Sequence, residues 1–103
     1  MNEKLMFEYM AEIDLPMPID NEFISLIPAQ RAMINKLMNE RIITSYAVSI
    51  EDGKLWTTLI AESEEDAESI LLQFPIIDRV EYAISKLAFH NNISLQPQQF
   101  SLN

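Results

Sequence analysis

Few side chains in this sequence can move a proton near neutral pH, and two of them are the first candidates for chemistry. His90 is the only histidine, so it is the only side chain of the type that changes charge close to neutrality. Glu8 and Glu12 lie four residues apart in an alternating segment, which separates them by about 13 Å along one face of a strand. That separation excludes a paired carboxylate dyad. Glu8 or His90 can still act singly as a general acid or base.

The same residues also have interpretations that involve no catalysis. Glu8 and Glu12 can form ion pairs with Arg31, Arg79 or a partner chain. His90 follows the last alternating segment and precedes two asparagines, as a surface loop residue would. Both interpretations stay open at the level of sequence.

A second group of residues can hold a small molecule. Tyr46, Trp56 and Thr58 have the same parity along two extended runs, and we expect them to form an apolar wall with a few polar groups. Met10 and Glu12 complete the predicted substrate-binding set. Ordinary core packing is the alternative explanation for these residues.

Composition excludes several kinds of site. The chain has no cysteine and one histidine, so a metal centre would depend on carboxylates, and no spacing of carboxylates supports one. Asp and Glu at residues 64–66 are typical of a helix start, where they favour the positive end of the dipole. A single glycine leaves no glycine-rich loop for a phosphate or dinucleotide. We expect no metal and no cofactor.

The formal net charge of −9 limits the possible partners. A negative chain repels the phosphates of nucleic acids and the headgroups of an anionic membrane, so we expect neither as a partner. The first residues hold no apolar run of signal-peptide length, and no stretch reaches the roughly 20 apolar residues that span a bilayer. Together with the lack of cysteine, these features predict a cytoplasmic protein.

The clearest structural element is a hairpin over residues 43–61, where two extended runs flank Asp52 and Gly53. Asp-Gly between such runs favours a two-residue type I′ turn, because the twist of that turn matches the twist of the strands. Gly53 is the only glycine of the chain, and it stands where positive φ is required.

Two further segments alternate as strands. Residues 5–15 place Met6, Glu8 and Met10 on one face and mostly larger apolar side chains on the other, which predicts a half-buried strand that Pro16 ends. Residues 80–89 alternate in the same way and predict the last strand.

Helical spacing appears in two places. From Asp20 or Asn21 as the cap, apolar residues recur at intervals of three and four, and we expect Pro28 either to kink this helix or to begin a second one. Ser63 is the predicted cap of another helix that runs to about residue 73. The apolar stripe of the first helix comprises Phe23, Ile24, Ile27, Met33, Ile34, Leu37, Met38 and Ile42.

The order strand, helix, strand, strand, helix, strand predicts a ferredoxin-like α+β fold. Right-handed crossovers give a four-stranded antiparallel sheet with the first and third strands central and both helices on one face. Residues 1–92 are expected to form this domain and residues 93–103 a polar C-terminal tail. Met6 and Met10 would be exposed on the other face, so we expect a homodimer through that open face.

Three short sequence features resemble one family. The first strand ends in Leu15-Pro16, residues 72–78 read Leu-Gln-Phe-Pro-Ile-Ile-Asp, and His90 follows the last strand. Over residues 5–92 these features are similar to the muconolactone isomerase-like branch of the dimeric α+β barrels. The resemblance implies a barrel formed by two copies, larger rings of dimers, and an activity that moves a proton within an unsaturated lactone. The chain departs from the family on the first strand, where Glu8 and Met10 replace a histidine and a lysine.

These observations lead to three hypotheses of different classes. The first is a small homodimeric barrel whose pocket, between the sheet and the helices, binds a small apolar or aromatic-derived molecule, with Glu8 or His90 catalysing proton transfer. The second is a non-catalytic ligand-binding or structural assembly domain in which Glu8 and Glu12 form interfacial salt bridges. The third is a cofactor-free oxygenase of the related barrel type.

Overall fold

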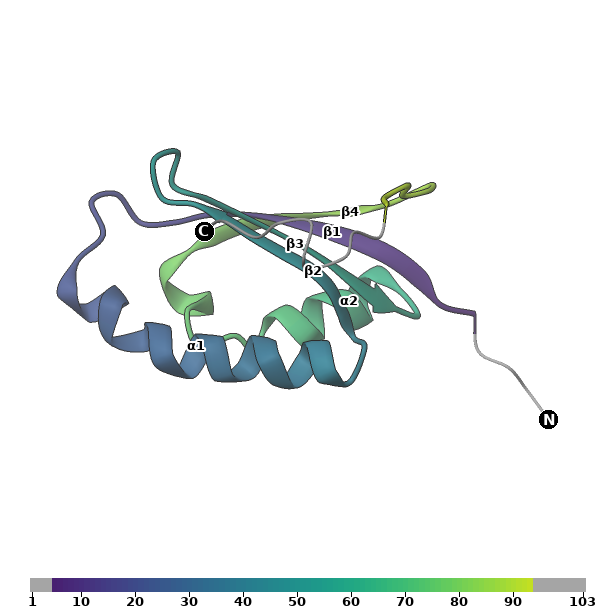
Figure 1. Ribbon diagram of the computed structural model, residues 1–103, viewed down its shortest axis with the longest axis horizontal. Helices are drawn as coiled ribbons and strands as arrows, with labels where there is room; N and C mark the ends of the chain where they lie inside the picture. The colour runs from purple at the N-terminus through teal and green to yellow at the C-terminus, as the bar shows by residue number, and fades with distance from the viewer. Residues whose placement is uncertain (1–4, 94–103) are drawn as a thin grey trace, which may run out of the picture.

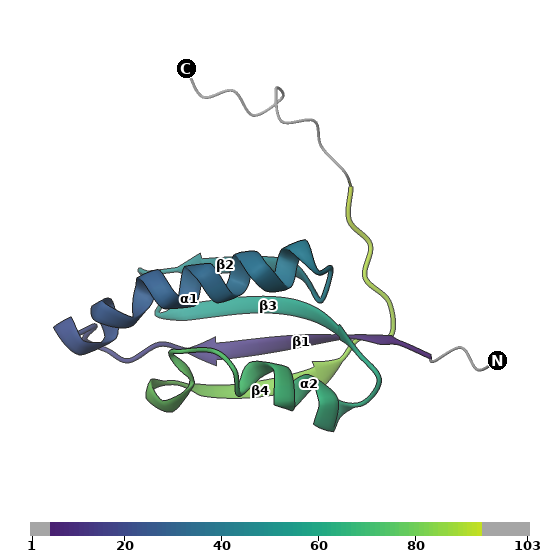
Figure 2. The same cartoon turned by 90° about the horizontal axis from the view of Figure 1, so that it is seen from below.

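Four antiparallel strands form one sheet, and two helices pack on the same side of it (Figure 1). The computed structural model describes residues 5–93. The strand order is β2-β3-β1-β4, so the first and third strands are central as predicted. Seen from the helix side, α1 lies over β2 and β3, and α2 lies over β1 and β4 (Figure 2). The elements are β1 (Phe7–Asp14), α1 (Asn21–Asn39), β2 (Ile43–Ser49), β3 (Lys54–Ala61), α2 (Glu64–Leu71), the 3-10 helix η1 (Ile77–Arg79) and β4 (Glu81–Lys86).

The predicted ferredoxin-like α+β fold is therefore confirmed. The predicted polar tail, apart from Ile93, lies outside the described residues. No helix within residues 5–93 is long and apolar enough to cross a membrane.

Strand β1 gives the sheet two chemically different faces. Tyr9, Ala11 and Ile13 are at most 3% exposed and belong to the core beneath the helices. The residues between them point to the opposite face, because successive side chains of a strand alternate. We call this opposite face the open face. The buried core also contains Leu15, Phe23, Ile34, Leu37, Ile43, Leu55, Leu59, Ala61, Ala67, Leu71, Phe74 and Ile76.

Both helices begin at the predicted caps. The Asp20 carboxylate accepts a hydrogen bond from the Phe23 amide at 2.8 Å, and the Ser63 hydroxyl accepts one from the Asp66 amide at 3.1 Å. Helix α1 continues through Pro28 as one element, so the predicted alternative of a second helix starting there is wrong.

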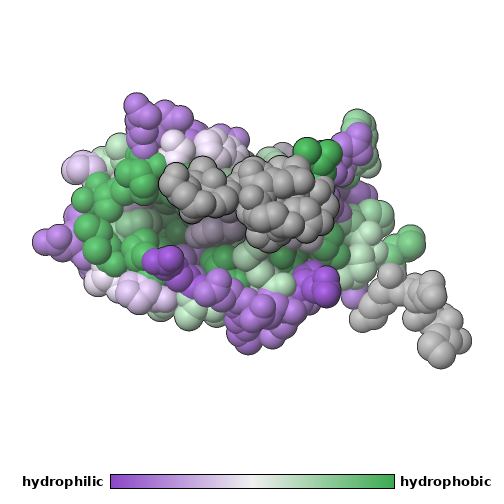
Figure 3. Space-filling model, viewed as in Figure 1, coloured by the Kyte–Doolittle hydropathy of each residue, from purple (hydrophilic) through white to green (hydrophobic). Residues whose placement is uncertain are grey.

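Two members of the predicted apolar stripe of α1 lie at the surface. Ile24 is 52% and Met38 is 41% exposed. Near the start of α1, Met17 in the β1–α1 connection is also exposed, and Figure 3 shows apolar surface over this end of the molecule. The apolar stripe of α1 is therefore wider than the face of the helix that packs on the sheet.

The hairpin forms as predicted, but the predicted type I′ turn is wrong. Ser49 pairs with Lys54, which leaves a four-residue loop from Ile50 to Gly53. Gly53 has φ of +64°, and it is the only residue of the loop with positive φ, whereas a type I′ turn needs two. A Cβ atom on Gly53 would lie 3.1 Å from the Met17 sulfur, and the Leu15 amide donates to the Gly53 carbonyl at 2.9 Å. Contact with the β1–α1 connection therefore sets the conformation of the loop.

The segment between α2 and β4 holds an element that the sequence did not indicate. Residues 77–79 form the short helix η1, and β4 covers residues 81–86 instead of the predicted 80–89. Beyond the end of β4, the Leu87 amide still donates to the Glu8 carbonyl at 2.9 Å. This bond keeps the chain that leads to His90 beside β1.

Candidate functional site

The residues predicted to share one site lie on opposite faces of the sheet. Tyr46 pairs with Thr57 and faces α1, whereas its neighbour Ala47 pairs with Trp56. The loop of the hairpin has an even number of residues, so an even-numbered position of β2 lies opposite an odd-numbered position of β3. The expectation that Tyr46 shares a face with Trp56 is therefore wrong. The predicted residues on the open face are Glu8, Met10, Glu12, Trp56 and Thr58.

Glu8 and His90, the two predicted catalytic residues, meet on the open face. His90 Nδ1 lies 3.2 Å from Glu8 Oε2, although the residues are 82 positions apart in sequence. The His90 side chain is 27% exposed and the Glu8 side chain 23%. The Thr44 hydroxyl donates to the same Oε2 atom at 3.0 Å. Both contacts are therefore made to the same carboxylate oxygen, Oε2.

A chain of hydroxyl groups extends from Glu8 into β2 and β3. Thr44 Oγ1 lies 2.6 Å from Thr58 Oγ1, and Ser45 Oγ lies 2.5 Å from the same Thr58 atom. Thr44 occupies an irregularity in β2, where the pairing shifts between Ile43 and Ser45. This bulge turns the Thr44 hydroxyl toward Glu8. We call Glu8, Thr44, Ser45, Thr58 and His90 the sheet-face cluster.

Sequence reasoning missed Thr44 and Ser45, because both are ordinary strand residues in a hairpin. The bulge that brings Thr44 to Glu8 has no glycine or proline to mark it. The contact between the hydroxyl groups and the carboxylate therefore depends on the bulge together with the pairing of β2, β3 and β1.

Glu12 does not join the sheet-face cluster. Its carboxylate lies 3.1 Å from the Lys54 amine, which also lies 2.5 Å from the Asp14 carboxylate. Hydrogen bonds to Asp14 and then Glu12 raise the pKa of Lys54. Glu12 therefore belongs to an ion-pair group at the hairpin end of the sheet.

The predicted ion pairs with arginine do not form. Arg79 pairs with Glu22 at the start of α1, which raises the pKa of Arg79. Arg31 lies on the helix side of the sheet, where it lines a pocket. The expectation that either arginine holds Glu8 or Glu12 is therefore wrong.

Apolar side chains flank the sheet-face cluster on the open face. Met10 pairs with Thr58, and Trp56 pairs with Glu12, so both apolar side chains project from the central strands beside the polar groups. Met10 and Trp56 are partly exposed. Ala47 and Ala83, on the outer strands, are exposed on the same face. The open face thus combines one acid–imidazole pair with neighbouring apolar side chains.

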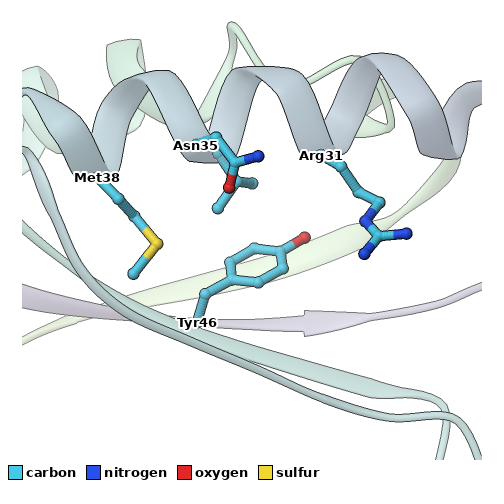
Figure 4. A pocket seen from close by; sticks show the side chains of 5 residues that line it. Arg31, Asn35, Met38 and Tyr46 are labelled. Atoms are coloured by element: carbon cyan, nitrogen blue, oxygen red, sulfur yellow. The ribbon is translucent and has the colours of Figure 1, made fainter. Parts of the chain in front are cut away.

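On the other side of the sheet, a pocket of about 200 Å³ lies between α1 and β2 (Figure 4). The Tyr46 hydroxyl accepts a hydrogen bond from the Gln30 amide at 3.1 Å. Burial raises the pKa of Tyr46, and the hydrogen bond from Gln30 lowers it by a smaller amount. The pocket is lined by Arg31, Ile34, Asn35, Met38 and Tyr46.

Of the predicted binding residues, only Tyr46 lines this pocket. The four residues from α1 were missed because the sequence does not show which turns of that helix stand over the edge strand. Within residues 5–93, no three His, Asp or Glu side chains lie where they could hold a metal ion.

Comparison with known proteins shows a likeness in fold. No protein-family model and no curated protein sequence matches the chain. A crystal structure of muconolactone isomerase superposes with a TM-score of 0.64, covering 86% of this chain and 96% of that chain at 14% sequence identity. At this identity the likeness shows the fold alone. The chain is thus similar in fold to muconolactone isomerase.

Proposed function

We propose that this protein binds a small, largely apolar or aromatic-derived molecule on the open face and moves a proton within it, as an isomerase. The observation that carries the proposal is the contact of Glu8 with both His90 and Thr44 through one oxygen. A carboxylate that is oriented in this way can take a proton from carbon with Oε1 and return it to another carbon of the same molecule. Such a shift needs no oxidant, reductant or co-reactant.

The charges on the open face favour an uncharged reacting molecule. Glu8, Glu12 and Asp14 share this face, and the nearby amine of Lys54 is already bound by two of them. A carboxylate of the substrate would be repelled here, whereas a neutral ring such as a lactone would not. Met10 and Trp56 offer apolar surface to such a ring.

A second copy of the chain would complete the site. The open face of one copy supplies only one wall of a cavity. Ala47 and Ala83 are small and exposed on the outer strands, and they would let a second sheet approach closely. Sheet-to-sheet association would bury Trp56 and Met10 and exclude water from the carboxylate. The name of the structurally similar muconolactone isomerase makes a proton shift within a lactone the first reaction to test.

The test is proton exchange into uncharged unsaturated lactones, with the carboxylate-bearing muconolactone as the charged comparison, which should exchange more slowly. NMR follows the incorporation of solvent deuterium into the lactone. This incorporation reports removal of a proton from carbon even when the product is not known. We expect Glu8→Gln to slow exchange at least about 100-fold, which is the lower end of typical general acid–base contributions. Analytical ultracentrifugation should show that the variant keeps the dimer.

A matched control is Glu81→Gln, which makes the same change on the open face. Glu81 pairs with Asp14, at the opposite end of β1 from Glu8. This variant should exchange protons at the wild-type rate. Exchange that survives Glu8→Gln would refute the assignment. A wild-type protein that exchanges no probe, together with a Glu8→Gln variant whose dimer is weakened, would favour the structural assembly hypothesis.

A further inference from the structure

The pocket between α1 and β2 has a polar end and an apolar end. Arg31 extends from α1 toward the hydroxyl end of Tyr46, while Met38 lies near the opposite end of the ring (Figure 4). Ile34 is only 4% exposed and belongs to the core. Asn35 lies between these two ends and completes the lining (Figure 4).

Three of the described cations are paired with carboxylates, whereas Arg31, like Arg41 and Lys86, is not. Lys36, Lys54 and Arg79 each form an ion pair with a carboxylate. Among the described residues, no carboxylate lies within salt-bridge distance of Arg31. The Arg31 guanidinium can therefore pair with the carboxylate of a ligand at short range, although the net charge of −9 repels anions at longer distances.

The Tyr46 hydroxyl is arranged as a donor. It accepts a hydrogen bond from Gln30, and Gln30 is itself only 2% exposed and accepts from the Ile76 amide at 3.4 Å. Because Gln30 uses the lone pair of the phenol oxygen, the phenol proton can be donated toward the pocket. A phenol is already protonated at neutral pH, because its ordinary pKa is about 10, and burial raises the pKa of Tyr46 further.

The volume restricts the size of the ligand. At about 200 Å³, the pocket is smaller than the roughly 300 Å³ at which pockets for drug-sized ligands begin. A single ring or a short aliphatic chain is the scale that fits. The Tyr46 ring, Ile34 and Met38 are the apolar surfaces that such a body would contact.

We propose that this pocket is a second binding site, for a small monocarboxylate with an apolar or single-ring body. The carboxylate lies against the Arg31 guanidinium and accepts the Tyr46 proton, and Asn35 adds an amide donor. The body of the ligand lies along the Tyr46 ring toward Met38. The site is on the opposite side of the sheet from Glu8 and His90, so it is independent of the proposed chemistry on the open face.

Benzoate is the probe, and benzyl alcohol is its uncharged counterpart. Titration of isotopically labelled protein, followed by amide NMR shifts, should give saturable changes that centre on the middle of α1 and on Tyr46. We expect benzoate to bind at least about tenfold more tightly than benzyl alcohol, since charge-assisted hydrogen bonds are worth roughly that factor or more. Arg31→Gln should remove this preference.

Lys36→Gln is the matched control. It removes one positive charge from the exposed surface of α1, where Lys36 pairs with Glu40 at 3.8 Å, but it leaves the pocket lining unchanged. Benzoate affinity should change less than about threefold, as expected for a screened surface charge. Three results would overturn the proposal: shifts that centre elsewhere, a preference for benzoate that survives Arg31→Gln, or equal losses in the two variants.

Discussion

Replacement of Gln30 by methionine removes the polar link between α1, β2 and the chain after α2. Gln30 is 2% exposed, and its amide donates to the Tyr46 hydroxyl at 3.1 Å and accepts from the Ile76 amide at 3.4 Å. Methionine has a similar length and no strong hydrogen-bonding group. The variant therefore keeps the packing volume of α1 while removing both hydrogen bonds.

The two lost bonds have unequal weight. Ile76 is 1% exposed, so its amide loses its partner in a dry environment, which costs about 1–3 kcal/mol. The length of that bond, 3.4 Å, points to the lower half of this range. Tyr46 is only partly buried, so water can replace Gln30 at its hydroxyl at a cost of roughly 0.5 kcal/mol. The sum is about 2 kcal/mol, which lowers Tm by roughly 8–16 °C in a domain of this size.

Urea unfolding of Gln30→Met, Tyr46→Phe and the double variant measures these contributions separately. Tyr46→Phe removes one partner and should cost about 1 kcal/mol, and the double variant should show a coupling energy of roughly 0.5–1 kcal/mol. A Gln30→Met variant within about 0.5 kcal/mol of wild type would refute the reasoning, because that is the range of ordinary surface substitutions. A coupling energy of zero would show that the link to Tyr46 contributes nothing.

Two other predictions concern the open face and alkaline pH. Ala47→Glu places a charge on the open face and should raise the dissociation constant of the proposed dimer at least about tenfold in ultracentrifugation. The control Ala32→Glu, on the exposed surface of α1, should leave that constant unchanged. A monomeric wild type at micromolar concentration would refute the dimer. The Tyr82 hydroxyl donates to the Glu68 carboxylate at 2.7 Å, which raises the pKa of Tyr82. This contribution to stability is therefore present below the unfolded value of about 10 and is lost as pH rises through the folded value. Tyr82→Phe should reduce the decline of stability above about pH 10; an unchanged decline in urea unfolding would contradict this.

Local patterns were sufficient for the four strands, the two α-helices and their order, but not for η1. Alternation over residues 5–15 and 80–89 predicted β1 and β4, each of which is shorter than its alternating segment. The caps Asp20 and Ser63 predicted the starts of both helices. These signals depend on neighbours in the chain, because a cap bonds an amide only three positions away. Topology then followed from the crossover rule, which leaves few arrangements for this order of elements.

Such patterns did not predict the pairing register of the hairpin or the contacts between segments that are distant in sequence. The loop of the hairpin has four residues instead of the two that Asp-Gly favours, and its Gly53 carbonyl accepts a hydrogen bond from the Leu15 amide, a distant contact that no dipeptide preference includes. The face of Tyr46 does not depend on this difference, because two-residue and four-residue loops both place an even-numbered position of β2 opposite an odd-numbered position of β3. The meeting of Glu8 with His90 depends on the path of the chain after β4, and the approach of Thr44 depends on a bulge.

One buried residue did carry a signal in the sequence. Gln30 lies seven positions after Phe23 and four before Ile34, which is the spacing of one helix face. A polar residue on that apolar face either lies at the surface, where the apolar row is interrupted, or is buried with hydrogen-bond partners. Its burial could have been inferred, but Tyr46 and Ile76 as its partners could not.

The alternation of β1 has a consequence for protein engineering. Every second residue of this central strand belongs to the core, and each residue between them belongs to the open face, so Glu8 is flanked by Phe7 and Tyr9. A combinatorial library at positions 8, 10 and 12 would leave every core side chain of β1 untouched. New specificities can therefore be selected on this scaffold with little effect on its folding, much as loop randomisation is used in antibodies.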